Sequence, residues 1–251
     1  ILSYNVWSNG LFNPGRQPRF ERIIKALKPD IMGFQEAYDD NHIEALFDDW
    51  LPEVNWHVSS EWNGNYVVSK YPILFQGNHS WKSMGVLLDT EEVLGKPLFF
   101  INSHFSCCGA NDNRQEQVDE LMSFLRTLKD GGGPFTLSEG TPIVHVGDFN
   151  FVGYRQQLVT LTYGDIVDEN SFGIDFLPDW DDSPLKDLFS SHTHIRMGYT
   201  WRNDGSEWNP GKLDYILYTD SVLEPDKHFV LNTMVMPEED LSNYNLELDD
   251  T

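Results

Sequence analysis

The stretch Thr141–Gly153 reads TPIVHVGDFNFVG, and its pattern decides most of the fold prediction. The run Ile143–Val146 within it is typical of a strand that is buried on both faces. The run ends in the letters GDFN, which bring Asp148 and Asn150 directly after a buried strand. Because Asp and Asn also favour turns, this stretch alone predicts either a functional strand end or an ordinary turn.

Four other apolar runs carry a polar side chain close to one end. They contain Asn5 (SYNVW, residues 3–7), Glu36 (DIMGFQE, 30–36), His104 (INSHF, 101–105) and Asp214 (KLDYIL, 212–217). Each is weak evidence alone, since a single acid or histidine in such a place is usually structural. If the strands are neighbours, however, these polar groups converge at one edge of the sheets. Such oxygen donors suit Mg²⁺ or Mn²⁺ rather than Zn²⁺.

The rest of the chain predicts many strands and a few helices of moderate length. Predicted strands cover residues 1–6, 31–34, 56–59, 66–69, 84–88, 98–103, 143–146 and 213–218, and residues 164–211 are rich in loop signals. Helical spacing is found at residues 20–27 and 118–128, with Asn113 and Glu116 as a cap pair before the second. Asn41 and Glu44 indicate a capping box for a short helix. Two sheets packed face to face, with helices outside, would bury this pattern best.

The composition limits the possible partners. The chain has 251 residues, with 40 acids against 17 Lys and Arg and a formal net charge of −23. This length suits one large domain, and we expect a single monomeric domain over residues 1–251. The charge argues against tight non-specific binding of duplex nucleic acid, whereas divalent cations would be attracted. No apolar run approaches the roughly 20 residues of a membrane span, so no transmembrane segment is predicted.

The two cysteines and the first residue bear on the compartment. Cys107 and Cys108 are adjacent and cannot form a disulfide framework. We expect two small, partly buried thiols, with a strained disulfide between them as the alternative. The sequence starts at Ile1, inside a predicted strand, which indicates a shortened or processed chain. These features and the acidic surface favour a secreted or periplasmic protein.

Several motifs resemble those of one known superfamily. In order along the chain, SYNVW, DIMGFQE, INSHF, VHVGDFN and KLDYIL resemble the endonuclease/exonuclease/phosphatase superfamily, and VVSKYPI (residues 67–73) is similar to its mid-chain strand. That superfamily includes deoxyribonuclease I, abasic-site endonucleases, inositol polyphosphate phosphatases and neutral sphingomyelinases. The resemblance is specific for the superfamily but not for a substrate. It implies an α+β fold: a four-layer α/β/β/α sandwich of two mainly antiparallel sheets flanked by helices.

The resemblance also implies a metal site. Glu36 would be the principal Mg²⁺ ligand, helped by Asn5 directly or through water. Asp148 would lie near the metal and would position or deprotonate the attacking water. A metal held by few carboxylates keeps open positions for the substrate phosphate and for water.

Further roles are implied around the phosphate. Asn150 would hydrogen-bond the scissile phosphate, His104 would donate to a non-bridging oxygen, and Asp214 would brace the site. Arg114, in NDNRQEQ, matches an arginine often found at the start of the helix after the histidine strand. It would contact phosphate or form a salt bridge.

Aromatic residues precede the KLDYIL strand. Trp201 and Trp208 would stack on a base or line a lipid-facing rim of the substrate pocket, or else pack under their own loop.

One family feature is absent from the sequence. Family members usually end with a strand introduced by Ser-Asp-His, whose Asp-His pair helps to activate the water. No Asp-His pair follows Tyr215, since His228 lies in DKHF. Either the sequence given stops before this motif and its last strand, which we favour because losing that strand would leave an open sheet edge, or the protein lacks the pair. In the second case, the loss of general-base help would cost roughly 10²–10⁴ in rate.

The sequence therefore predicts a Mg²⁺-dependent phosphoesterase, with Mn²⁺ as a second suitable metal. Its substrate would be a phosphodiester in a short nucleic acid, a nucleotide or a phospholipid headgroup. The alternative is a non-catalytic metal- or ligand-binding domain that retains the fold but lacks the Asp-His pair.

Overall fold

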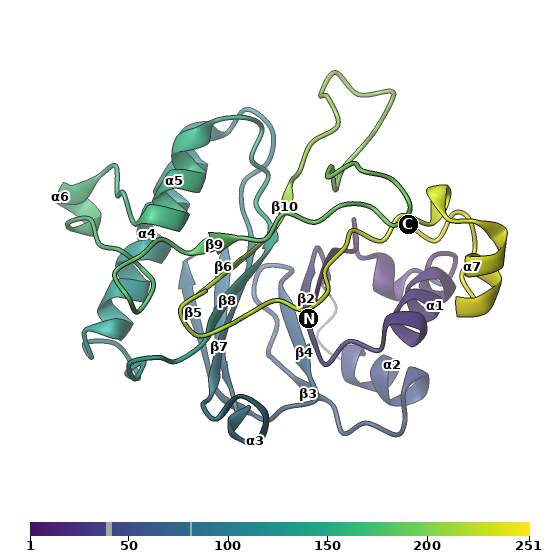
Figure 1. Ribbon diagram of the computed structural model, residues 1–251, viewed down its shortest axis with the longest axis horizontal. Coiled ribbons are helices and arrows are strands. Elements are labelled where there is room, and N and C mark those ends of the chain that lie inside the picture. Colours follow the sequence, from purple (N-terminus) through teal and green to yellow (C-terminus); the bar gives the residue numbers. More distant parts are fainter. Residues whose placement is uncertain (39–41, 81) are drawn as a thin grey trace.

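Two β-sheets pack face to face in the computed structural model, which describes residues 1–38, 42–80 and 82–251 (Figure 1). Within this described part, the first sheet has the strand order β1-β2-β4-β3 and the second has the order β5-β6-β7-β8-β10-β9. The pairs β1–β2 and β7–β8 are parallel, and the other pairs of described strands are antiparallel. The prediction of two mainly antiparallel sheets is confirmed.

The strands of the first sheet are β1 (Leu2–Asn5), β2 (Ile31–Gln35), β3 (His57–Val58) and β4 (Tyr66–Ser69). Those of the second are β5 (Ile73–Ser80), β6 (Ser83–Leu88), β7 (Leu98–His104), β8 (Ile143–Asp148), β9 (Lys186–Asp187) and β10 (Asp214–Tyr218). The α-helices are α1 (Gln17–Leu27), α2 (Ile43–Trp50), α3 (Glu91–Leu94), α4 (Asn111–Lys129), α5 (Arg155–Tyr163), α6 (Glu169–Phe172) and α7 (Glu238–Tyr244). The short 3₁₀ helices are η1 (Gly10–Phe12) and η2 (Thr233–Val235).

Three separate apolar clusters show that the molecule has four layers. One cluster fills the space between the first sheet and helices α1 and α2, and includes Phe34 and Phe47. A second lies between the other sheet and α4, with Ile101 and Leu125 as members. The third joins the two sheets and includes Val67. Figure 1 shows the same arrangement, with α1 and α2 on one side of the sheets and α4 and α5 on the other. The predicted α/β/β/α sandwich is confirmed.

Side-chain alternation along the strands directs the candidate residues toward the interface between the sheets. In β8, Ile143 packs in the helix-side cluster, whereas Val144 and Val146 pack between the sheets. Because side chains alternate with period two, Asp148 also faces the interface between the sheets. The same alternation directs the side chain of Asp214 inward from β10, since Ile216 packs between the sheets. The interface therefore changes from apolar at its centre to polar at this edge.

A buried amide ties the two sheets together just beneath that edge. Asn102 of β7 donates from Nδ2 to the backbone oxygens of Phe34 (2.9 Å) and Tyr66 (3.0 Å) on the opposite sheet. Its Oδ1 accepts a hydrogen bond from Gln35 Nε2 at 2.6 Å. Since buried polar groups are costly unless paired, this network sets the relative position of the sheets.

Gly147 lets the two parallel strands β7 and β8 approach each other closely. Its φ is +145°, and a Cβ placed there would lie 1.9 Å from the backbone oxygen of Ser103. No other residue type fits such a contact without moving the backbone. The glycine in the opening stretch is therefore required by packing next to Asp148.

The structure corrects several predicted details. Helix α4 begins at Asn111, so Asn113 and Glu116 lie inside the helix and do not cap it. Asn41, the first half of the predicted capping box, lies outside the described residues. The segment VVSKYPI is not one strand, because its first residues belong to β4 and Ile73 starts β5 in the other sheet. Helix α5 and most of β5 were not predicted.

Two further observations complete the fold. Cys107 and Cys108 are free and exposed rather than partly buried, and the Cys108 thiol donates to Cys107 Sγ at 2.7 Å. Among the described residues, no helix is long and apolar enough to cross a membrane.

Candidate active site

Asn5, Glu36 and Asp148 meet at the polar edge of the sheets. The Nδ2 atom of Asn5 donates to Glu36 Oε1 at 3.0 Å and to Asp148 Oδ2 at 2.9 Å. Glu36 Oε2 accepts a hydrogen bond from the backbone N–H of Ser8 at 2.7 Å. One amide from the first sheet thus holds two carboxylates that come from different sheets.

The His104 ring lies close to both carboxylates. Its Nε2 lies 3.9 Å from Glu36 Oε1 and 3.9 Å from Asp148 Oδ2, too far for a hydrogen bond to either. Burial lowers the pKa of His104 below its ordinary value, and the charges of Asp148 and Glu36 oppose this shift. A ring nitrogen near the carboxylates but not hydrogen-bonded to them can donate to a third group, such as a substrate oxygen.

Asp148 and Asp214 are neighbours on adjacent strands, and the charge of Asp148 affects the pKa of Asp214. They are register partners in the β8–β10 pair. Burial, together with the charge of Asp148, raises the pKa of Asp214 to about 8. Burial also raises the pKa of Asp148, against the lowering effects of His104 and Asn5. Crowded, buried carboxyls of this kind are common at catalytic and metal sites.

Asn150 lies beside Asp148 on the loop that follows β8. Its backbone N–H donates to Asp148 Oδ1 at 3.0 Å, and its Nδ2 donates to the backbone oxygen of Phe105 at 3.0 Å. Phe105 directly follows His104 and donates its own N–H to the oxygen of Asp148 at 3.1 Å. These contacts place Asn150, Asp148 and the histidine strand in one connected group.

The backbone is strained around this group. Trp7, Ser8, Glu36 and Asn150 all have left-handed φ angles, between +44° and +59°. Each such residue costs about 1–2 kcal/mol relative to a right-handed one. Strain of this kind gathers at functional sites, because the surrounding structure must overcome it.

Thr200 is a positioning residue that the sequence reasoning missed. Its Oγ1 accepts the backbone N–H groups of Leu213 (3.0 Å) and Asp214 (2.9 Å). The hydroxyl thus fixes the start of β10, and with it the Asp214 side chain. Nothing in the sequence distinguishes this threonine, because its role depends on the loop folding back over the strand.

The predicted aromatic residues lie on the same loop. Trp201 is half-buried and pairs with Gly211 in an antiparallel bridge, next to Thr200. Trp208 is 38% exposed. Contact of either ring with a substrate stays a prediction.

Arg114 is not available to a substrate. The residue is fully buried, and its guanidinium donates to the Ser106 backbone oxygen (2.6 Å), Asn111 Oδ1 (2.5 Å) and Gln157 Oε1 (3.3 Å). These acceptors use all three guanidinium nitrogens, and they are a carbonyl and two amides rather than acids. The geometry contradicts both the predicted phosphate contact and the predicted salt bridge, and Arg114 instead links the loop after His104 to α4 and α5.

The donor set at this site fits Mg²⁺. Among the described residues, no three His, Cys, Asp or Glu side chains form a group that could hold a metal by themselves. Mg²⁺ is usually bound by one or two carboxylates together with waters and substrate oxygens, which Glu36 and Asp148 can supply. The oxygen of Asn5 accepts the Trp7 N–H at 2.8 Å, so its nitrogen faces the carboxylates. In this geometry Asn5 orients the two acids rather than offering an oxygen to the metal.

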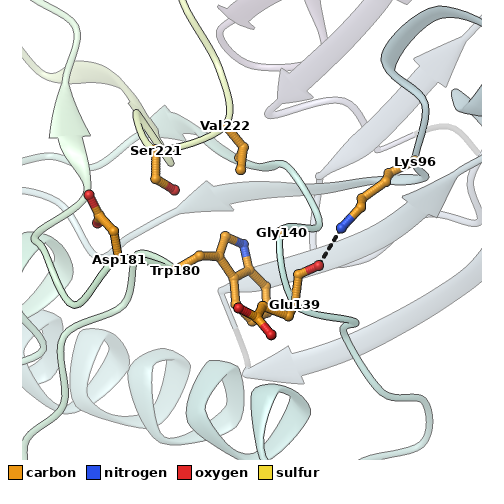
Figure 2. A pocket seen from close by; sticks show the side chains of 7 residues that line it. All are labelled: Lys96, Glu139, Gly140, Trp180, Asp181, Ser221 and Val222. Carbon is orange, nitrogen blue, oxygen red and sulfur yellow. Dashed lines mark hydrogen bonds between the residues drawn. The ribbon is translucent and has the colours of Figure 1, made fainter.

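A separate hollow, of about 480 Å³, lies at the opposite ends of β7, β8 and β10 (Figure 2). It is lined by Lys96, Glu139, Gly140, Trp180, Asp181, Ser221 and Val222. The Lys96 ammonium donates to the Glu139 backbone oxygen. None of the predicted site residues reaches this hollow, so we assign it no part in the chemistry.

Comparison with solved structures supports the fold. A magnesium-bound beta toxin mutant from Staphylococcus aureus aligns with 90% of this chain and 86% of its own, at 17% identity and a TM-score of 0.56. Sphingomyelinase C from Streptomyces griseocarneus aligns over 89% and 84%, at 18% identity and a TM-score of 0.55. ANGEL2, a 2',3'-cyclic phosphatase, aligns over 87% and 83%, at 16% identity and a TM-score of 0.56. At these identities the similarity shows a shared fold.

Comparison at the sequence level assigns the family. No curated protein matches the chain. The Endonuclease/Exonuclease/phosphatase family, in contrast, matches residues 2–233, which is nearly the whole chain and contains each of the residues that meet at the site. The chain belongs to the Endonuclease/Exonuclease/phosphatase family, a family of hydrolases that act on phosphoesters.

Proposed function

We propose that the chain is a Mg²⁺-dependent phosphodiesterase whose active site is the edge formed by Asn5, Glu36, His104 and Asp148. The observation that carries this proposal is the shared Asn5 amide, which holds two carboxylates together beneath the His104 ring. The magnesium ions named for the beta toxin structure support the choice of metal on the same fold. Manganese would suit the same oxygen donors.

Each residue has a distinct task in this proposal. Glu36 and Asp148 would hold the metal, while Asn5 keeps their oxygens in place. Bound Mg²⁺ supplies charge neutralisation for the phosphate oxygens and a lower pKa for a bound water. His104 donates from Nε2 to a non-bridging phosphate oxygen, and Asn150 hydrogen-bonds the phosphate with its remaining amide hydrogen. Hydrogen-bond donors fixed in advance stabilise the charge that develops in the transition state.

Asp214 acts on the site through its neighbour Asp148. Its raised pKa keeps the carboxyl protonated near neutral pH, so that it adds no second negative charge beside Asp148. Thr200 holds this residue through its backbone N–H.

A second candidate is a non-catalytic metal- or ligand-binding domain. One observation favours it: the sequence has no Asp-His pair between Tyr215 and Thr251. The same carboxylates would then bind a cation without hydrolysis.

Hydrolysis of bis(p-nitrophenyl) phosphate tests the proposal. The assay is run with Mg²⁺, Mn²⁺ or EDTA, on the 251-residue chain and on the chain with any residues that follow Thr251 in its gene. We expect activity that requires the metal and is abolished in Glu36→Ala and Asp148→Ala. The exposed acid Asp226, changed to Ala, is the matched control and should leave activity unchanged.

The outcomes separate the two candidates. Full activity in Glu36→Ala or Asp148→Ala would contradict the assigned site. Mg²⁺ binding by calorimetry without hydrolysis by either form of the chain would favour the binding domain.

A further inference from the structure

A left-handed turn directly follows Asn5 in the chain. Trp7, Ser8 and Asn9 have φ angles of +44°, +49° and +61°. The turn is closed by the N–H of Gly10, which donates to the Val6 oxygen at 3.2 Å. A tryptophan with a left-handed φ is a rare outlier, so this conformation calls for a reason.

The turn is bonded to the site residues at several points. The Trp7 N–H donates to Asn5 Oδ1 at 2.8 Å, and the Ser8 N–H donates to Glu36 Oε2 at 2.7 Å. The Asn9 N–H donates to the backbone oxygen of Glu36 at 2.8 Å. Trp7 therefore stands beside the two residues that would flank the metal and the scissile phosphate.

Arg16 holds Trp7 in one orientation. Its Nη1 donates to the Trp7 oxygen at 2.6 Å and its Nη2 to the Val6 oxygen at 2.7 Å. Its guanidinium carbon lies 5.1 Å from the centroid of the Trp7 ring, within the range of a cation–π contact. The residue is nevertheless 70% exposed. Its backbone and one ring face are thus fixed, while most of the side chain stays open to solvent.

A tryptophan exposed in this way buries little apolar surface within the folded chain. An ordered aromatic platform, however, loses little conformational entropy when a ligand stacks on it. Among the described residues, no second ring packs against Trp7, so the site lacks the aromatic cage that recognises a quaternary ammonium group. A single open face suits a planar ring.

We propose that Trp7 is a specificity-determining residue that stacks on a nucleobase of the substrate, so that the chain prefers phosphodiesters of nucleosides. This inference rests on the proposed phosphodiesterase function. Stacking does not need a basic surface, which explains how a chain with a net charge of −23 can hold a short, single-stranded nucleotide. Long duplexes, which need many cationic contacts, are disfavoured.

Three phosphodiesters without activated leaving groups test this preference. Thymidylyl-(3′→5′)-thymidine carries planar rings, glycerophosphocholine carries a quaternary ammonium group, and glycerophosphoglycerol carries neither. Turnover of each is followed by ³¹P NMR with Mg²⁺, for the unmodified chain, Trp7→Ala and Trp7→Phe. Tyr163→Ala removes another exposed aromatic residue, at the end of α5, and is the matched control.

We expect Trp7→Ala to lower kcat/KM for the dinucleotide about 10-fold, equal to about 1.4 kcal/mol, with little change for glycerophosphoglycerol. Trp7→Phe should restore part of the loss, and Tyr163→Ala should change nothing. An equal loss on all three substrates, or a loss only on glycerophosphocholine, would overturn the inference.

A binding measurement keeps the test valid if the chain turns over none of these substrates. Calorimetry with thymidine 5′-monophosphate and with methyl phosphate, both with Mg²⁺, then reports on the ring alone. Tighter binding of the nucleotide that disappears in Trp7→Ala supports the stacking role, even if the proposed hydrolysis fails. Equal binding by the unmodified chain and Trp7→Ala contradicts it.

Discussion

The Nδ2 atom of Asn5 donates to Asp148 Oδ2 at 2.9 Å, although the two residues are 143 positions apart and belong to different sheets. The same nitrogen also holds Glu36. The site thus depends on the correct relative position of the two sheets.

Removing this shared donor should weaken the site without unfolding the chain. We expect Asn5→Ala to lower Mg²⁺ affinity or kcat/KM for a phosphodiester by about 10–100-fold, because residues that orient metal ligands have effects of this size. Asn243→Ala, an exposed amide on α7, should behave like the unmodified chain. Unchanged affinity and activity in Asn5→Ala would show that the amide only anchors the turn at Trp7.

Metal removal should change thermal stability through Glu36. A ligand present at 100 times its Kd stabilises the folded state by about 2.7 kcal/mol. We therefore expect Mg²⁺ to raise Tm by about 5–10 °C over the EDTA value for a chain of this size. Glu36→Gln should lose this increase relative to its own Tm in EDTA, which should itself be lower, because the amide keeps only one oxygen for the two hydrogen bonds that Glu36 accepts from Asn5 and Ser8. Scanning calorimetry measures both values, and a full Mg²⁺ response in Glu36→Gln would argue against Glu36 as a ligand.

Gly147→Ala should be strongly destabilising. The added Cβ would lie 1.9 Å from the Ser103 backbone oxygen, and the φ of +145° is unfavourable for alanine. Forcing β7 and β8 apart should cost about 3 kcal/mol or more in the free energy of unfolding, measured by urea denaturation. Gly109→Ala is the control, because a Cβ there meets nothing within 4 Å. Equal stability of the two variants would contradict the close approach of the strands.

His145 should contribute to acid sensitivity. Burial lowers the pKa of this residue from 6.5 to about 3, while its Nε2 lies 2.7 Å from Ser103 Oγ. Below pH 6.5 His145 binds a proton in the unfolded chain but stays neutral in the folded chain. The free energy of unfolding therefore falls as the pH drops from 6.5 toward 3. One such group contributes about 1.4 kcal/mol per pH unit within that window.

Replacement of His145 tests this contribution directly. His145→Gln should flatten the dependence of unfolding free energy on pH between pH 6 and pH 4 by about 2–3 kcal/mol. His228→Gln, which changes an exposed histidine, should leave the curve unchanged. An identical curve for both variants would exclude a buried neutral His145.

Strands were easier to predict than the sheets that contain them. The predicted run at residues 66–69 coincides with β4, and the run at 98–103 differs from β7 only by the added His104. The segment VVSKYPI, in contrast, resembles a single strand in the sequence. In the structure it is divided, because its first residues belong to β4 and Ile73 starts β5 in the other sheet. The alternation of apolar and polar residues along a strand indicates which side chains are buried, but not which sheet or helix packs against them. Helix α5 was missed, and its β-branched residues Val159, Thr160 and Thr162 have lower helix propensity.

The sequence by itself determined which side chains end the apolar strands, and hence the list containing Asn5, Glu36, His104, Asp148 and Asp214. It could do so because strand period and residue chemistry are local properties. Only the tertiary structure decided that Arg114 is buried, that Thr200 positions Asp214, and that Trp7 is fixed beside the site. Those properties depend on contacts between segments far apart in the chain, which packing of the two sheets brings together.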